Sequence, residues 1–374
     1  MKRIYLDNAS TTALRPEVTT TMVEVLQTTY GNPSSTHSFG RDAKVLIETA
    51  RKNIAKILQC NAQEILFTSG GTEGNNWVLQ NAITTLKVTR IITSKIEHHA
   101  VLHPVQFLEK YYGIEVVFVQ HFADGSVDLI HLETLLSDEK PTLVSLMHVN
   151  NEIGTILDLN AVGHLCQQYK AYFHSDTVQS VGKMHFHLQQ TPIDFIVASA
   201  HKFHGPKGIG FLYVKKNTPM HSYIMGGEQE KGLRAGTEAV HQIVGMSKAL
   251  ELSYEHLDAD EKHIQECKTY AISQFKQYFP GTECNGSETG LYTLLNIRLP
   301  LPEEKTSIIL FALDMKGIAV SRGSACQSGS VKPSHVLAEL LPSSEIGKPS
   351  LRLSFSHTTT FDEIDALIQA LITI

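Results

Sequence analysis

Lys202 is the residue of this sequence whose setting best suits covalent chemistry. It lies in the run SAHKFHGPKG (199–208), directly after an apolar segment at 194–198 that is typical of a strand. A strand of an open α/β sheet would place this lysine at the carboxyl edge, where such sheets bind ligands. Partial burial beside two histidines favours the neutral amine that a Schiff base requires. A surface turn with a solvated lysine is the alternative interpretation.

Asp176 is a second candidate, because it ends another predicted strand and precedes Gln179 by three residues. A carboxylate at one strand end, upstream of a lysine at another, fits a site for pyridoxal phosphate. There the carboxylate would keep the pyridine nitrogen protonated, so that the ring can accept electrons. Taken alone, Asp176 is better explained as a helix cap.

A third cluster suits a phosphate group. In FTSGGTEGNN (67–76) a predicted strand ends in two glycines and a hydroxyl residue, and a helix follows. Free backbone N–H groups at such a helix start form a small concavity for an anion. The pattern has no Walker A lysine and is not GxGxxG. An ordinary turn with Thr72 as the helix cap is the alternative.

Polar residues also follow two further predicted strands. His98 and His99 come after the strand at 90–93, where either ring could stack on a flat cofactor or handle protons. Asn151 comes after the strand at 142–146, where an amide can hold a polar ring substituent or form an Asx turn. Structural roles remain open for each. Together, the clusters at these strand ends are expected to converge on one edge of the sheet.

Cys326 and Arg352 extend the set toward sulfur and carboxylate chemistry. Cys326 lies in RGSACQSGS (322–330), among glycines and small hydroxyl residues that cannot bury it, which is typical of a reactive thiol in an exposed loop. Arg352 lies in a short apolar strand, where a guanidinium needs a partner. The bidentate fit to an amino-acid carboxylate is one option and a structural salt bridge is the other.

The elements that position these residues follow from a regular alternation between residues 64 and 214. Near-continuous apolar runs separated by helix-length spacers predict a largely parallel sheet that is covered on both faces. The last two runs are joined by a Gly-rich turn, which allows an antiparallel pair. The strands are predicted at 65–68, 90–93, 115–119, 142–146, 171–174, 194–198 and 210–214. A long helical stretch is expected from about residue 246 to 278, and a closing helix at 361–374.

Composition excludes several classes of protein. The chain has 374 residues, of which 42% are hydrophobic and 19% charged, so it can bury a large core. Its net charge of −6 argues against direct nucleic-acid binding, and no apolar run is long enough for a membrane helix. The acidic residue near the N-terminus argues against an export signal. Five scattered cysteines without a CxxC pair predict neither disulfides nor a metal site. A soluble cytoplasmic protein is expected.

These motifs, taken together, resemble cysteine desulfurases of the NifS/IscS type, in the class V aminotransferase group of pyridoxal-phosphate enzymes. The resemblance runs almost end to end. It includes YLDNASTT (5–12), GNPSSTH (31–37), GGEQEKGLRAGT (226–237), the cysteine loop at 323–329, and the blocks at 67–76, 97–101, 149–154, 175–183 and 199–213. Gly71 stands where many relatives have Ala, Gly74 replaces a commoner Ser, and Ser10 stands where Ala is frequent.

The resemblance implies a fold and a division of the chain. The fold class would be α/β, the pyridoxal-phosphate-dependent transferase fold type I. A large domain with a mostly parallel mixed sheet flanked by helices would be joined to a smaller α+β domain. Residues 1–15 would pack with the small domain, 16–252 would form the large domain, and 253–374 would form the small domain that carries the cysteine loop. A composition shift at 250–255 agrees with that boundary.

The resemblance also implies roles by matching position. Lys202 would hold the cofactor and shuttle the Cα proton, His98 would lie over its ring as an acid or base, and Cys326 would accept the sulfur. Asn151 and Arg352 would receive the substrate carboxylate. The cofactor-binding residues would be Gly71, Thr72, Asn151, Asp176 (pyridine nitrogen), Gln179 (phenolic oxygen), Ser199, His201, Lys202 and, from the partner subunit, Thr237.

The implied activity converts L-cysteine to L-alanine and leaves the sulfur as a persulfide on Cys326. That sulfur would supply iron–sulfur cluster assembly, tRNA thiolation or both, through a scaffold or another acceptor protein. The implied enzyme is a homodimer without a resident metal, although an iron–sulfur cluster could bind Cys326 transiently. The alternatives are a selenocysteine lyase or cysteine/cystine C–S lyase of the same fold, and a non-catalytic sulfur-carrier adaptor.

Overall fold

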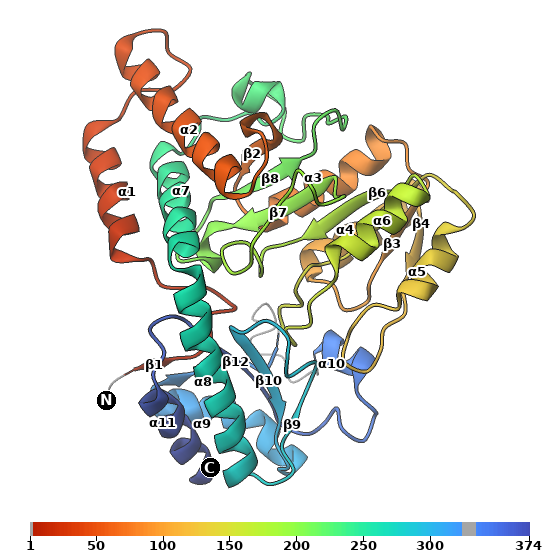
Figure 1. Ribbon diagram of the computed structural model, residues 1–374, viewed down its shortest axis with the longest axis vertical. Coiled ribbons are helices and arrows are strands. Elements are labelled where there is room, and N and C mark those ends of the chain that lie inside the picture. Colours follow the sequence, from red (N-terminus) through yellow and green to blue (C-terminus); the bar gives the residue numbers. More distant parts are fainter. Residues whose placement is uncertain (1–2, 324–333) are drawn as a thin grey trace.

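The computed structural model describes residues 3–323 and 334–374. Its upper part in Figure 1 contains a seven-stranded mixed sheet. In spatial order the strands are β2 (Ile65–Thr68), β8 (Gly210–Val214), β7 (Phe195–Ser199), β6 (Tyr172–Asp176), β5 (Thr142–Ser145), β3 (Arg90–Thr93) and β4 (Glu115–Phe118). Only β8 runs antiparallel to its neighbours, so the predicted mostly parallel sheet and its antiparallel last pair are confirmed.

Helices cover both faces of this sheet. Ile91 and Leu143 pack on one face with Trp77, while the next residues along each strand, Ile92 and Val144, pack on the other. This alternation explains the near-continuous apolar runs, because both faces of each strand are buried. The helices that flank the sheet are α1 (Pro16–Thr28), α2 (Ser38–Ile57), α3 (Gly71–Thr84), α4 (His99–Tyr112), α5 (Leu129–Leu136), α6 (Leu159–Gln168) and α7 (Val240–Glu255).

The lower part of Figure 1 has a separate core. Its antiparallel sheet has the order β12 (Ser350–Ser354), β10 (Leu294–Arg298) and β9 (Glu283–Cys284), and β1 (Ile4–Tyr5) pairs in parallel with β11 (Ile318–Ala319). Around these strands lie α8 (Leu257–Tyr278), α9 (Ile309–Met315), α10 (His335–Leu340) and α11 (Phe361–Ile372). The boundary at residues 252 and 253 stays a prediction.

The helical stretch expected from residue 246 to 278 is two helices rather than one. α7 ends and α8 begins at His256, whose backbone angles (φ −104°, ψ 6°) leave the helical range. Its N–H bonds to the carbonyl oxygens of both Leu252 and Tyr254, which closes the first helix. In Figure 1, α8 continues below α7 and connects the upper and lower parts. No helix in the described ranges is long and apolar enough to cross a membrane.

His174 in β6 makes the stability of the fold depend on pH. The residue is fully buried, its Nδ1 lies 2.9 Å from Ser145 Oγ, and burial lowers its pKa to about 3. An unfolded histidine has a pKa of about 6.5, so between these values the unfolded chain binds the additional proton. The stability contributed by the neutral ring is therefore complete above about pH 6.5 and is lost as the pH falls.

We expect this residue alone to make unfolding easier by about 2 kcal/mol at pH 5 than at pH 8. Urea unfolding of the wild type and of His174→Gln at both pH values measures this contribution, because the variant should lose that part of the pH dependence. His185→Gln, which changes an exposed histidine, serves as the control. An equal pH dependence in the wild type and His174→Gln would contradict the expectation.

Candidate active site

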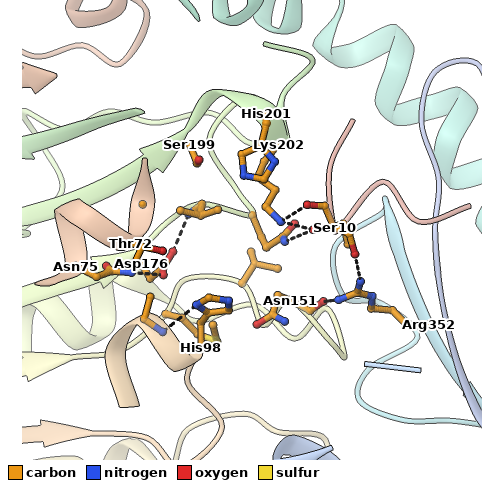
Figure 2. A pocket seen from close by; sticks show the side chains of 17 residues that line it. Ser10, Thr72, Asn75, His98, Asn151, Asp176, Ser199, His201, Lys202 and Arg352 are labelled. Atoms are coloured by element: carbon orange, nitrogen blue, oxygen red, sulfur yellow. Dashed lines mark hydrogen bonds between the residues drawn. The ribbon is translucent and has the colours of Figure 1, made fainter. Parts of the chain in front are cut away.

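A cavity of about 260 Å³ lies at the carboxyl edge of the parallel strands. Figure 2 shows Asp176 and Thr72 on one side of it, Ser10 and Arg352 on the other, and Lys202 reaching in from the end of β7. All of the predicted site residues line this cavity except Cys326 and Thr237. Cys326 lies outside the described residues, and Thr237 is exposed and does not line the cavity. The expected convergence of the strand-end clusters is thus confirmed.

The phosphate candidates lie where α3 begins. Gly70 is the N-cap and no side chain caps the helix, so Thr72 lies within the first turn and the interpretation of Thr72 as the cap is wrong. The first N–H groups of an α-helix have no partners inside the helix and attract anions. At Gly71 an added Cβ would lie 2.5 Å from Val178 Cγ2, so the glycine found here in place of a commoner Ala leaves room for Val178.

His201, from the short 3₁₀ turn after β7 (Ala200–Lys202), completes this end of the cavity. Its Nδ1 lies 3.2 Å from Thr11 Oγ1. Burial, and next the charge of Lys202, lower the pKa of His201 to about 4, so its ring is neutral at neutral pH. Ser199 Oγ lies 3.3 Å from the place where a Cβ on Gly70 would be. The cavity wall therefore includes the hydroxyl of Ser199 and the imidazole of His201 in addition to the start of α3.

Asp176 is held by two donors rather than by capping a helix. Its Oδ2 accepts a hydrogen bond of 2.6 Å from Asn75 Nδ2, and its Oδ1 accepts one of 3.0 Å from the Val178 N–H. Both oxygens of this carboxylate therefore have a hydrogen-bond donor. Asn75, which is completely buried, was not singled out from the sequence. Its position four residues after Gly71 on α3 is the signal that places both on one helix face.

His98 forms the N-cap of α4, and its Nδ1 accepts a hydrogen bond of 3.1 Å from the Ala100 N–H. Burial lowers its pKa, with Asp176 acting in the opposite direction and Lys202 adding to the decrease. A neutral ring whose Nδ1 accepts a hydrogen bond carries its proton on Nε2. The residue therefore brings an uncharged N–H donor to the cavity wall.

Lys202 is held by the N-terminal segment of the chain. Its Nζ donates hydrogen bonds of 2.6 Å to the Ala9 carbonyl and 2.8 Å to the Ser10 carbonyl. Sequence reasoning did not find these partners, because a backbone carbonyl leaves no trace in the side-chain pattern. The amine thus lies in the cavity rather than in bulk solvent, and the interpretation as a solvated surface lysine is wrong.

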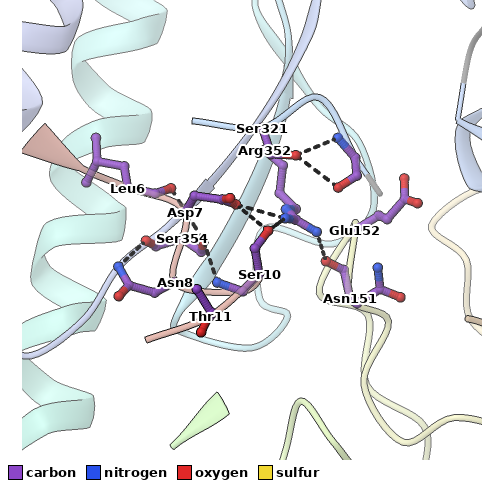
Figure 3. A network of polar contacts seen from close by, with 12 residues as sticks. Leu6, Asp7, Asn8, Ser10, Thr11, Asn151, Glu152, Ser321, Arg352 and Ser354 are labelled. Atoms are coloured by element: carbon purple, nitrogen blue, oxygen red, sulfur yellow. Dashed lines mark hydrogen bonds and ion pairs between the residues drawn. The ribbon is translucent and has the colours of Figure 1, made fainter. Parts of the chain in front are cut away.

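Arg352 lies in β12 and is 2% exposed. Its Nη2 donates to Asp7 Oδ1 at 2.8 Å and to Ser10 Oγ at 2.7 Å, and its Nη1 donates to the Asn151 carbonyl at 2.9 Å (Figure 3). The salt bridge that the sequence left open is therefore present. Arg352 also lines the cavity, and its buried Nε has no hydrogen-bond partner in the described part of the chain. Ser10, a departure from the family pattern, here adds a partner for the guanidinium.

Glu152 lies next to Asn151 and connects the cavity wall with both ends of the segment that carries Cys326. It is completely buried, and its Oε2 accepts a hydrogen bond from Ser334 Oγ. An added Cβ on Gly323 would lie 2.5 Å from the same oxygen. The residues that precede and follow the segment 324–333 therefore meet beside the cavity.

The comparisons with known proteins agree with this geometry. The model of the family "Aminotransferase class-V" matches residues 4–367, and the chain belongs to this family. It is 41% identical to cysteine desulfurase IscS of Dictyoglomus turgidum, over 99% of this chain and 94% of that protein. It is 38% identical to cysteine desulfurase IscS of Clostridium botulinum, with the same coverage. A solved structure titled "NifS-like protein" has a TM-score of 0.91 and 34% identity, covering 100% of this chain and 99% of that one.

Members of this family depend on pyridoxal 5′-phosphate, and the cavity fits that cofactor. It offers a primary amine at Lys202, a carboxylate at Asp176 that accepts hydrogen bonds from two donors, and the uncapped start of α3. Asn75 Oδ1 is buried without a partner in the described residues. These groups complement an aldehyde, a pyridine nitrogen and a phosphate. The described residues of the chain contain no cluster that could hold a metal ion.

Proposed function

We propose that the protein is a pyridoxal-phosphate-dependent cysteine desulfurase that converts L-cysteine to L-alanine and transfers the sulfur to Cys326. The observation that carries this proposal is the junction at Glu152. It joins Asn151 on the cavity wall to Gly323 and Ser334, the residues on either side of the segment with Cys326. A lyase that eliminates sulfide directly would not need a cysteine between these two residues of the chain. The names of the relatives support the same activity.

Several residues of the cavity have a part in the proposed reaction. Arg352 and Asn151 bind the carboxylate of L-cysteine and orient its Cα–H bond toward Lys202, whose amine removes the proton. Asp176 pairs with the pyridine nitrogen and keeps it protonated. When it is bound in the cavity, pyridoxal phosphate supplies a sink for the electron pair of the Cα–H bond. The N–H groups at the start of α3, with Ser199 and His201, hold the phosphate.

The sulfur step is balanced without a further reactant. The Cys326 thiolate attacks the sulfur of the substrate, so a sulfur–sulfur bond forms as the carbon–sulfur bond breaks. The carbon that lost sulfur takes up a proton, for which the Nε2–H of His98 is the donor that we propose. L-cysteine and the Cys326 thiol thereby become L-alanine and a Cys326 persulfide. The persulfide sulfur then passes to an iron–sulfur scaffold or another acceptor protein, including those of tRNA thiolation, in the cytoplasm.

A homodimer would complete the site with Thr237. A second cavity of about 650 Å³ adjoins the first and shares Thr72 and His98 with it. Its wall contains Phe107, which is 52% exposed, and Tyr223. A second copy that covers this apolar wall would bring its own Thr237, exposed in the single chain, to the phosphate end.

The products of the reaction test the proposal against its alternatives. Direct elimination of sulfide by a C–S lyase gives pyruvate and ammonia, whereas desulfuration gives alanine. We expect the holoenzyme to form alanine and sulfide from L-cysteine in the presence of a thiol reductant. Pyruvate as the main product would favour the lyase, alanine from selenocysteine alone would favour the selenocysteine lyase, and no product would favour the adaptor.

Arg352→Gln is expected to weaken cysteine binding by about 10- to 100-fold, because charge-assisted hydrogen bonds contribute about 1.5–3 kcal/mol. The spectral change of the bound cofactor on titration with cysteine measures the dissociation constant. Asp7→Asn is the matched control, since it removes the salt bridge but keeps the guanidinium. Should Asp7→Asn weaken binding as much as Arg352→Gln, the role of Arg352 is structural and the assignment is wrong.

A further inference from the structure

Lys183 is a buried lysine close to Lys202. It is 9% exposed and lines a small space that Lys202 also borders. The charged groups that face it are Lys202 and Arg352, and in the described residues it forms no ion pair. Burial, followed by these two charges, lowers its pKa to about 7. Burial of an amine among positive charges is unfavourable unless the amine forms hydrogen bonds.

The partner of Lys183 is the side-chain amide of Gln179. Lys183 Nζ donates to Gln179 Oε1 at 3.2 Å, while Gln179 Nε2 donates to the Ala9 carbonyl at 2.9 Å. With the amide turned over, its oxygen would face the Ala9 carbonyl, and its NH₂ group would face Lys183, whose charged form accepts no hydrogen bond. The first contact is repulsive, and so is the second while Lys183 is charged, so these neighbours fix which end of the amide lies where.

The orientation matters because Gln179 lines the cavity. An amide NH₂ group has two hydrogens, and the Ala9 carbonyl uses one of them. The Ala9 carbonyl also accepts the hydrogen bond from Lys202, at 2.6 Å. The second hydrogen of Gln179 therefore remains for a group that occupies the cavity beside Lys202.

We infer that Lys183 is a positioning residue that turns the NH₂ group of Gln179 toward the phenolic oxygen of the cofactor. The inference rests on the proposed function, which places that oxygen beside Gln179. An N–H donor favours the ionised phenolic oxygen, whereas a carbonyl in its place would favour the protonated one. Lys183 thus acts on the protonation of the bound cofactor through a neighbour and does not touch it.

The test is a pH titration of the absorbance of the bound cofactor in the absence of substrate. We expect Lys183→Met to raise the proton affinity of the absorbing group about tenfold relative to the wild type. Gln179→Leu should raise it similarly, and Lys183→Arg, which keeps a charged donor, should restore a value within about threefold of the wild type. Lys183→Leu takes the place of Lys183→Met if that variant does not fold.

The double variant Lys183→Met/Gln179→Leu separates positioning from a direct effect of the lysine charge. If Lys183 acts through Gln179, the double variant matches Gln179→Leu alone. Additive shifts, or no shift in Lys183→Met, would overturn the inference while leaving the proposed function intact. A wild-type protein that shows no absorbance from bound cofactor would instead overturn the proposed function and this inference with it.

Discussion

Lys202→Ala should abolish turnover, with a decrease of at least about 1000-fold, and should also remove the absorbance of covalently bound cofactor. In the proposed mechanism the residue supplies both the amine that binds the cofactor and the base that moves the Cα proton, and either loss alone has a large effect. The N–H groups at the start of α3 do not depend on this side chain. The apoprotein should therefore remain folded.

Lys207→Ala is the matched control for this experiment. Lys207 lies in the same turn but is exposed and does not line the cavity. Its replacement should change the rate of alanine formation by less than about twofold. The rate of alanine formation and the absorbance of the cofactor are measured on the same samples. A Lys202→Ala rate within tenfold of the wild type would show that another group performs the proton transfer.

Cys326→Ala should separate sulfur transfer from cofactor binding. We expect alanine formation to fall by at least about 1000-fold, because without the thiolate nothing attacks the substrate sulfur. The absorbance of the cofactor and its change on adding cysteine should remain, since the cavity residues are unaltered. Alanine release and the absorbance change are measured on the same samples.

The other cysteines cannot take over this role. Burial raises the pKa of Cys60 to about 12 and that of Cys284 to about 11, and it also raises the pKa values of Cys166 and Cys267. All four are therefore thiols rather than thiolates at neutral pH. Cys284→Ala is thus the control, with an expected activity within about twofold of the wild type. Full activity of Cys326→Ala would support direct elimination instead.

The sequence predicted the sheet and the position of the cavity because both follow from local signals. Apolar runs buried on two faces give strands, and polar residues directly after parallel strands must meet at one edge. Polar residues that follow such strands include Lys202, Asp176, His98 and Asn151. The long helical stretch was predicted without the break between α7 and α8, because that break at His256 is a change of backbone angles without a proline or glycine.

Contacts between distant parts of the chain could not be predicted in this way. Ala9 and Ser10 hold Lys202 through carbonyl groups, which every residue has, and Asp7 reaches Arg352 across 345 positions. The arrangement around Lys183 and Gln179 depends on the same N-terminal segment. Such contacts are set by how β1 and β12 place the segment against the large sheet rather than by any local pattern.

The most direct test of the central claim is mass spectrometry of the Cys326 peptide after one turnover. Holoenzyme is mixed with one equivalent of L-cysteine without reductant, and alanine and the modified peptide are quantified together. Cys326 is expected to gain one sulfur atom, with persulfide and alanine formed in equal amounts. Alanine or pyruvate formed while Cys326 remains an unmodified thiol would contradict it.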